Sequence, residues 1–217
     1  MKKLFILVLI GLCSFVDLFS QSVAASGMYN KGIILLNKAK TTENFLEAAF
    51  YFENLAKEFP HQWLVQYYAG LSYILAGQDA LDSKYSDDLL NKAQPLIDIA
   101  FSLKPGEPEL HILQAFHYQA RLQVDPQARA INLAQKADAS LKKAIEADSA
   151  NPRAYFLMAN NVYYTPVMFK GGPKNALPVF LKAREKFITY QAEFSFLPKW
   201  GEKENEEMIK ICNKSKI

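Results

Sequence analysis

Histidine and cysteine are the residues of this chain best suited to bind a metal or act as nucleophiles, and they are few. The three histidines are His61, His111 and His117, and the last two are six residues apart, which places them on different faces of a helix. No HExxH or CxxC spacing is present. Of the two cysteines, Cys13 lies in the apolar N-terminal stretch, and we expect Cys212 to pack as an apolar side chain. We therefore expect no metal site and no cofactor.

Other catalytic patterns are also absent from the sequence. There is no GxSxG, Walker or GxGxxG motif, and no pair of acidic residues stands out as a general acid and base. Gly171-Gly172, just before Pro173, could hold an anion at a helix N-terminus, but such a pair is more often a turn that caps the helix. We therefore expect a binding protein and not an enzyme.

The composition describes a folded chain of low net charge. Half of the 217 residues are hydrophobic, and the formal net charge is +3. This charge is too small to predict nucleic-acid binding, and no dense stripe of Lys and Arg is present. We expect a packed core and no nucleic-acid partner.

Residues 1–25 have the composition of a secretory signal peptide. Lys2-Lys3 precede an apolar run from Leu4 to Phe19, and Val23-Ala24-Ala25 supplies the small residues of a cleavage site. The alternative is an uncleaved membrane anchor, but Asp17 would be costly inside lipid. We expect cleavage here or near Ser20, which leaves no stable membrane span. The protein is then exported to the periplasm or the extracellular space.

An apolar pattern with helical spacing recurs along the rest of the chain. Each copy has a small residue, an apolar residue four positions later and another three positions beyond, so that all three lie on one helical face. The copies are Ala48-Phe52-Leu55, Ala93-Ile97-Ala100, Ala137-Leu141-Ala144 and Ala176-Phe180-Ala183. A second pattern, a small residue followed three positions later by a large one, occurs at Gly70 and Tyr73, Ala115 and Tyr118, and Ala159 and Val162. Fixed offsets between the two patterns favour repeats over an irregular helical bundle.

These patterns resemble the tetratricopeptide repeat over roughly residues 28–190, most closely from Leu141 to Tyr163. The resemblance implies an all-α fold, a tetratricopeptide-like α-solenoid of about four antiparallel helix pairs plus a C-terminal capping helix. We expect a signal peptide at residues 1–25, the repeat domain at 26–197 and the capping helix and tail at 198–217. Equivalent alanines lie 45, 44 and 39 residues apart, against about 34 in the family, so the connections or helices within pairs are longer.

The expected boundaries follow from local signals. Asp125-Pro126 predicts the start of a helix that runs to Asp148, and Gly77 to Ser86 predicts a loop. Pro95 and Pro178 predict either late helix starts near Asn91 and Asn175 or kinks. Thr165 to Gly172 predicts a loop whose aromatic residues fold back over the array or form a lip of its groove, and we favour folding back.

In the resembled family, the first helix of each pair lines a concave groove. The resemblance implies that the wall positions of this chain are largely aromatic and lack the basic clamp that binds a C-terminal carboxylate. For Tyr67 and Phe116, packing in the core is an equal alternative. The predicted partner-binding residues are Tyr67, Leu71, Ile112, Phe116, Arg153, Phe156, Asn160, Tyr163 and Tyr164.

Two functions remain open. The first is an exported scaffold that binds a peptide or protein in an open aromatic groove. The second is a periplasmic helper that holds a small apolar ligand in a pocket enclosed by Phe116, Phe156 and the loop from Tyr163 to Phe169. We favour the first.

Overall fold

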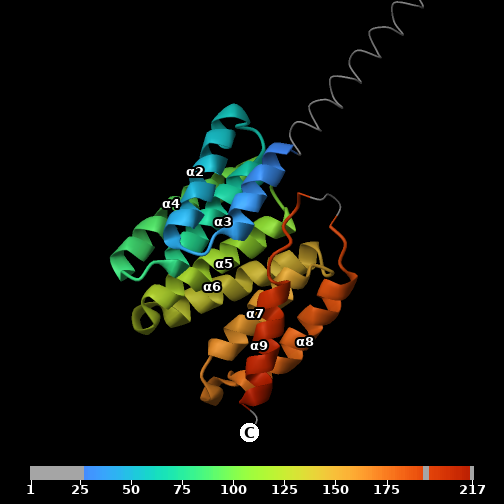
Figure 1. Ribbon diagram of the computed structural model, residues 1–217. Helices are drawn as coiled ribbons and strands as arrows, with labels where there is room; N and C mark the ends of the chain where they lie inside the picture. The colour runs from blue at the N-terminus through green and yellow to red at the C-terminus, as the bar shows by residue number, and fades with distance from the viewer. Residues whose placement is uncertain (1–26, 193–195, 216–217) are drawn as a thin grey trace, which may run out of the picture.

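The computed structural model describes residues 27–192 and 196–215, and this part of the chain is built from α-helices with one short 3₁₀ turn (Figure 1). The predicted signal peptide lies outside the described residues. A helix at residues 27–38 comes first, and the remaining elements are α2 (Thr42–Glu58), α3 (Trp63–Asp79), α4 (Ser83–Leu103), α5 (Pro108–Val124), α6 (Pro126–Ala147), α7 (Pro152–Tyr164), η1 (Val167–Phe169), α8 (Pro173–Thr189) and α9 (Glu202–Lys214).

Proline and capping side chains mark where the helices begin. A proline stands at the first turn of α5, α6, α7 and α8, where its missing N–H costs nothing. At the start of α6, the Asp125 carboxylate accepts a hydrogen bond from the backbone N–H of Ala128 at 3.1 Å, as an N-cap does. The α6 start predicted from Asp125-Pro126 is therefore the observed one.

The loop expected from Gly77 to Ser86 is confined to residues 80–82, and both predicted end residues lie in helices. Asp82 caps α4 by accepting a hydrogen bond from the backbone N–H of Tyr85 at 2.7 Å, so the helix starts earlier than predicted. The buried Ser86 hydroxyl donates to the Gly77 carbonyl at 2.6 Å and ties α4 to α3. A Cβ on Gly77 would lie 2.9 Å from Leu90 Cγ, so a glycine lets the two helices approach closely here. The extra repeat length lies in the helices.

A late helix start near Asn91 is wrong, because α4 already begins at Ser83, whereas α8 begins at Pro173, two residues before the expected Asn175. Pro95 lies inside α4, twelve residues after its first residue Ser83, and Pro178 lies inside α8, five residues after Pro173. Both prolines are exposed, so each ring lies on the solvent side of its helix. The backbone carbonyl that loses its helical partner there can be hydrated.

The helices stack as an α-solenoid in which each element packs on the next. Contacts run from α2 to α9 in sequence order, and α3 also contacts α5, as α5 contacts α7. First helices of neighbouring pairs therefore form a continuous inner layer. The repeated small residues Ala48, Ala93, Ala137 and Ala176 are fully buried, which explains why their spacing recurs.

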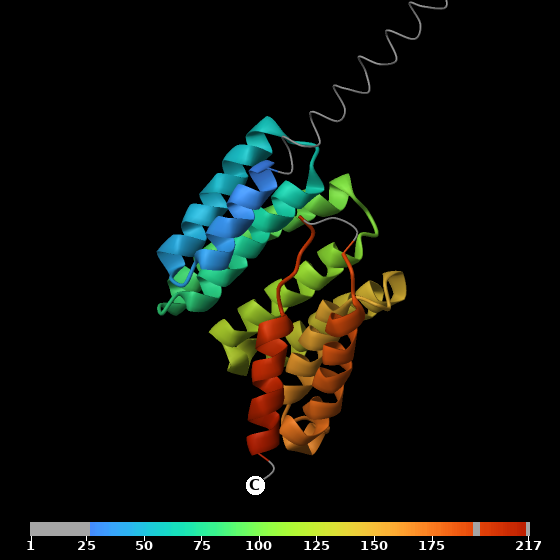
Figure 2. The ribbon, with the colours of Figure 1, turned by 45° about the vertical axis from the view of Figure 1, so that its right-hand side comes forward.

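Two apolar cores meet at α5, the helix that lies between the N-terminal and C-terminal halves of the array in Figure 2. Leu110 and Leu113 pack in the core of the N-terminal half, whereas Ile112 and Ala115 pack in the core of the C-terminal half. Trp200, from the segment before α9, packs against both. This one helix and one indole thus join the two halves.

The C-terminal helix covers the end of the array. α9 packs on α8, and Asn205 donates a hydrogen bond to the Phe180 carbonyl at 3.2 Å. Cys212 is fully buried among apolar residues, as expected. Among the described residues, no helix combines the length and apolar character needed to cross a membrane.

Candidate functional site

The predicted groove residues do not form an open wall. Tyr67, Leu71, Ile112, Arg153 and Phe156 are buried, each exposing 7% or less of its surface. The other four are more accessible: Phe116, Asn160 and Tyr163 are half-buried, and Tyr164 is exposed. The expectation that the inner positions are exposed is therefore wrong for most of them, and their role in partner binding stays a prediction.

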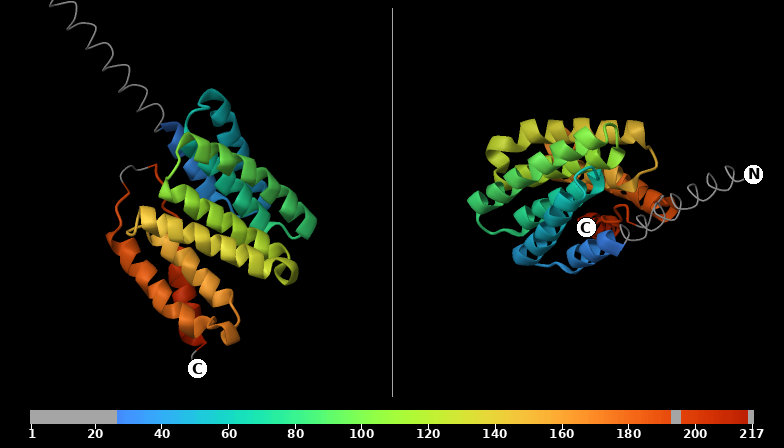
Figure 3. Two further views of the ribbon diagram at one scale, coloured as in Figure 1. Left: turned by 180° about the vertical axis from the view of Figure 1, so that it is seen from behind. Right: turned by 90° about the horizontal axis from the view of Figure 1, so that it is seen from above.

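Residues 196–201, which we call the strap, lie inside the curve of the array and cover these positions (Figure 3). The Trp200 ring stacks on Phe116 with centroids 5.2 Å apart, and its Nε1–H donates to the Tyr67 hydroxyl at 2.8 Å. The Tyr68 hydroxyl donates to the backbone carbonyl of Phe196 at 2.7 Å. The concave face is thus occupied by the chain's own extended segment.

Gly201 lets the strap turn into α9 against the inner layer. Its φ of +102° lies in the left-handed region that favours glycine. A Cβ at this position would lie 3.2 Å from Phe187 and 3.3 Å from Phe156, closer than usual packing. Both the backbone angle and the packing therefore require glycine at the end of the strap.

A buried ion pair lies under the strap. Arg153 Nε donates to both Glu109 carboxylate oxygens at 3.1 Å, and Nη2 donates to one of them. Asn151 Nδ2 donates to the same carboxylate at 2.5 Å. Burial alone would lower the pKa of Arg153, but the Glu109 charge and hydrogen bonds outweigh it, so the pKa of Arg153 is raised and its guanidinium stays charged. The Tyr190 ring lies over the guanidinium, 5.3 Å from centroid to Cζ.

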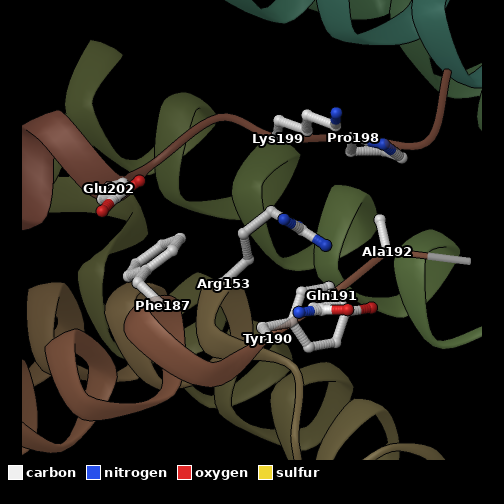
Figure 4. A pocket seen from close by; sticks show the side chains of 8 residues that line it. All are labelled: Arg153, Phe187, Tyr190, Gln191, Ala192, Pro198, Lys199 and Glu202. Atoms are coloured by element: carbon white, nitrogen blue, oxygen red, sulfur yellow. The ribbon is translucent and has the colours of Figure 1, made fainter. Parts of the chain in front are cut away.

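A cavity of about 370 Å³ opens beside this pair, within the usual size range of ligand pockets. Figure 4 shows Arg153 reaching between the strap, which carries Pro198 and Lys199, and the end of α8, which carries Tyr190. The residues that line the cavity are Arg153, Phe187, Tyr190, Gln191, Ala192, Pro198, Lys199 and Glu202. The rings of Phe187 and Tyr190 form the apolar part, and the exposed Lys199 lies at the rim.

The cavity overlaps the predicted site only at Arg153. Phe187 and Tyr190 come from the last turn of α8 and its C-cap, beyond the repeated pattern. Their spacing of three residues, which brings two aromatic side chains to one side of a helix end, is a signal from which the sequence could have predicted them. Lys199 lies in the Pro198-Lys199-Trp200-Gly201 turn, which stands out in the sequence, but nothing local shows where that turn docks.

The loop from Thr165 to Gly172 lies at the other end of α8 and neither folds over the array nor lines the groove. Val167, Met168 and Phe169 expose 74%, 82% and 68% of their surfaces, so the expected folding back is wrong. Gly172 is the N-cap of α8 at φ +87°, and its N–H donates to the Val162 carbonyl at 2.9 Å. Gly171-Gly172 thus forms the expected turn and helix cap.

Comparison with known proteins gives two informative structures. No family model and no curated protein matches the chain. The HusA haemophore from Porphyromonas gingivalis is 29% identical over 89% of this chain and 94% of its own, with a TM-score of 0.77. A thermophilic TPR protein of Thermus thermophilus is 17% identical over 92% and 95%, with a TM-score of 0.55. The fold is a tetratricopeptide-like repeat array. These likenesses point to a binding or scaffold role.

Proposed function

We propose that this protein binds haem or a related porphyrin in the cavity between α7, the end of α8 and the strap, and that it acts by binding and not by catalysis. The likeness to the HusA haemophore, which extends over nearly all of both chains, carries the proposal. This is a form of the small-ligand alternative that the sequence left open. The ligand class therefore comes from the comparison, and its position comes from the cavity.

The side chains of the cavity suit a flat, largely apolar molecule with anionic groups. Phe187 and Tyr190 offer ring faces to a porphyrin, and Lys199 can reach a carboxylate from the rim. Arg153 lines the same space, but its charge is already neutralised by Glu109. It serves mainly to hold the Tyr190 ring in place.

Ring contact, and not iron coordination, is the proposed basis of binding. Burial, followed by the Glu109 charge, raises the pKa of Tyr190, so this residue stays a phenol at neutral pH. A phenol is a poorer iron ligand than a phenolate. We therefore expect the affinities for iron-free protoporphyrin and for haem to differ by no more than about tenfold, which is about 1.4 kcal/mol of binding free energy.

The occupied concave face favours a small ligand over a peptide. Trp200 and the rest of the strap fill the groove, so a peptide would have to displace them. The same observation supports peptide binding as a second candidate function, because the groove holds a segment of the chain through aromatic stacking and a backbone hydrogen bond. In that case the strap occupies the position that a bound peptide would take.

Titration with haem and with iron-free protoporphyrin tests the proposal. Porphyrin absorbance and the quenching of tryptophan fluorescence, from Trp63 and Trp200, report binding. Phe187→Ala removes a cavity wall. We expect about three- to tenfold weaker binding, because a half-buried phenyl contributes about half of the roughly 1.5–3 kcal/mol of a full burial. Ile188→Ala is the matched control, since Ile188 is the next residue, exposes 74% of its surface and does not line the cavity.

Two results would reject the porphyrin site. One is wild-type protein that binds neither ligand at micromolar concentrations. The other is equal affinity of Phe187→Ala and Ile188→Ala. The peptide candidate is tested separately, by probing a peptide array with the Trp200→Ala variant to find whether a peptide can displace the strap.

Export is part of the same proposal. It is supported by the signal-like composition of residues 1–25 and by a neighbour described as a haemophore. N-terminal sequencing of the protein from the envelope and culture medium of a bacterial host tests it. A mature chain that still begins at Met1 would contradict cleavage.

A further inference from the structure

The end of the molecule opposite the cavity carries a cluster of exposed apolar side chains. Val167, Met168 and Phe169 form the short turn η1, and each exposes more than two thirds of its surface. Tyr164, at the end of α7, exposes 67%. Isolated exposed apolar residues are ordinary, but four within six positions mark a surface that contacts something.

Hydrogen bonds within the loop hold this apolar tip in shape. The Pro166 carbonyl accepts from the N–H of Phe169 at 2.9 Å and of Gly171 at 3.2 Å. The Thr165 hydroxyl donates to the Asn161 carbonyl at 2.7 Å, and Asn175 Nδ2 donates to the Gly171 carbonyl at 2.9 Å. Backbone carbonyls of the loop thus find partners within the loop and its flanking helices, and a hydrogen-bonded turn directs the apolar side chains outward.

The exposed charges on the tip and on the neighbouring ends of α8 and α9 are positive. Lys170 and Lys174 flank it and are exposed. The C-terminal end of α9 lies beside the start of α8 at the same end of the molecule (Figures 1 and 2), and it adds the exposed Lys210 and Lys214. No Asp or Glu occurs between Ser149 and Arg184, nor after Glu207. The segments that form this end therefore carry no acidic residue, and the Asp138 carboxylate of α6, which lies nearby, accepts a hydrogen bond from Asn161 Nδ2 at 2.6 Å.

We propose that this tip docks the protein reversibly on an anionic lipid surface. Val167, Met168 and Phe169 would enter the boundary between headgroups and acyl chains, about 5–10 Å deep for such interfacial elements. Tyr164 suits the headgroup level, where aromatic residues with a polar end are enriched. The four lysines would face lipid phosphates, whose negative potential attracts basic segments.

A lipid surface fits the tip better than a protein does. A stable protein interface buries about 800 Å² on each partner, with a shaped and well-packed centre. A three-residue turn that projects from the end of two helices offers far less. Shallow insertion into a flat, fluid and negatively charged surface needs neither a large area nor a complementary shape, only projecting apolar groups flanked by positive charge.

Docking through the tip would leave the cavity at the end of the molecule that is farther from the lipid. The tip precedes α8 and the cavity lies at its other end, and a 17-residue helix is about 25 Å long. The inference therefore does not rest on the proposed porphyrin function, and a failure of either leaves the other standing.

Sedimentation with lipid vesicles tests the inference. Purified protein is mixed with vesicles of phosphatidylcholine, or of phosphatidylcholine with about a third phosphatidylglycerol, at about 0.1 M salt. We expect binding to the anionic vesicles that is at least about tenfold stronger than to the neutral ones and that falls as salt is raised. Met168→Ser with Phe169→Ser should weaken it about tenfold or more, as should Lys170→Glu with Lys174→Glu.

The matched control carries the same kind of change elsewhere. Leu81→Ser with Phe50→Ser removes two exposed apolar side chains away from the tip, at the α3–α4 connection and on α2, which packs against α3 in the N-terminal half of the array. This control should bind vesicles as the wild type does. Absence of wild-type binding to anionic vesicles, or equal loss in the tip and control variants, would overturn the inference. So would loss of a protein partner in the tip variants without any vesicle binding, which would assign the tip to protein docking.

Discussion

Removing the charge of Glu109 should be among the most destabilising changes at the centre of the fold. In Glu109→Gln the carboxylate is lost, while Arg153, which exposes 2% of its surface, keeps its charge. Breaking a buried pair in this way costs about 3–5 kcal/mol, because the remaining charge is neither solvated nor paired. The pair also bridges α5 and α7, so the loss falls where successive repeats meet.

Thermal and urea unfolding, followed by circular dichroism, measure this cost. For a chain of this size, 1 kcal/mol corresponds to about 2–4 °C, so the midpoint should fall by roughly 6–20 °C. The Asp87–Arg129 pair is the control, because it is also held by two hydrogen bonds of 2.7 Å but its side chains expose 23% and 28%. Asp87→Asn should therefore cost about 1 kcal/mol or less.

The double variant Glu109→Leu with Arg153→Met separates burial from pairing. It removes both charges and should recover most of the loss, because an apolar pair of similar volume has no desolvation cost. The reasoning is refuted if Glu109→Gln is no more destabilising than Asp87→Asn. It is also refuted if the double variant is less stable than Glu109→Gln.

Three further changes have expected outcomes. Gly201→Ala should lower stability by about 1–3 kcal/mol in urea unfolding, since it combines a φ of +102° with a Cβ 3.2 Å from Phe187; an unchanged midpoint would contradict this. Burial lowers the pKa of His117 to about 4, so the unfolded chain takes up the proton first, and stability should fall by about 3 kcal/mol from pH 7 to pH 4. His117→Gln should remove that part of the slope, and urea midpoints across pH measure it. Trp200→Ala should cost about 3–5 kcal/mol, because the indole packs in both cores, and a loss below 1 kcal/mol in calorimetry would show that the strap is dispensable.

The repeat architecture was predictable because its determinants are local and periodic. Ala93, Ile97 and Ala100 share one helical face, and burial of that face is required wherever neighbouring helices stack. Pro126 and Pro152 mark helix starts for stereochemical reasons that do not depend on the rest of the fold. These features therefore appear in the sequence in the form that the structure uses.

The site was largely missed because its assembly is not local. Lys199 joins Arg153 and Tyr190 only after the strap has returned across the inner layer, and no spacing rule describes that return. The burial of Tyr67 and Phe156 follows from the same segment, so a wall predicted to be open is covered. At the loop, the aromatic composition was correctly noticed, but composition alone does not distinguish folding back from projection.

The strap also changes how the chain is expected to fold. In an open repeat array every contact is between neighbours, so structure can start anywhere and spread. Here the Tyr68–Phe196 and Trp200–Tyr67 hydrogen bonds join residues 128 and 133 positions apart. Such closure must wait until both halves of the array exist, because its entropy cost is recovered only when the receiving surface has formed. Docking of the strap is thus a late event that gives a linear chain of repeats the cooperativity of a closed one.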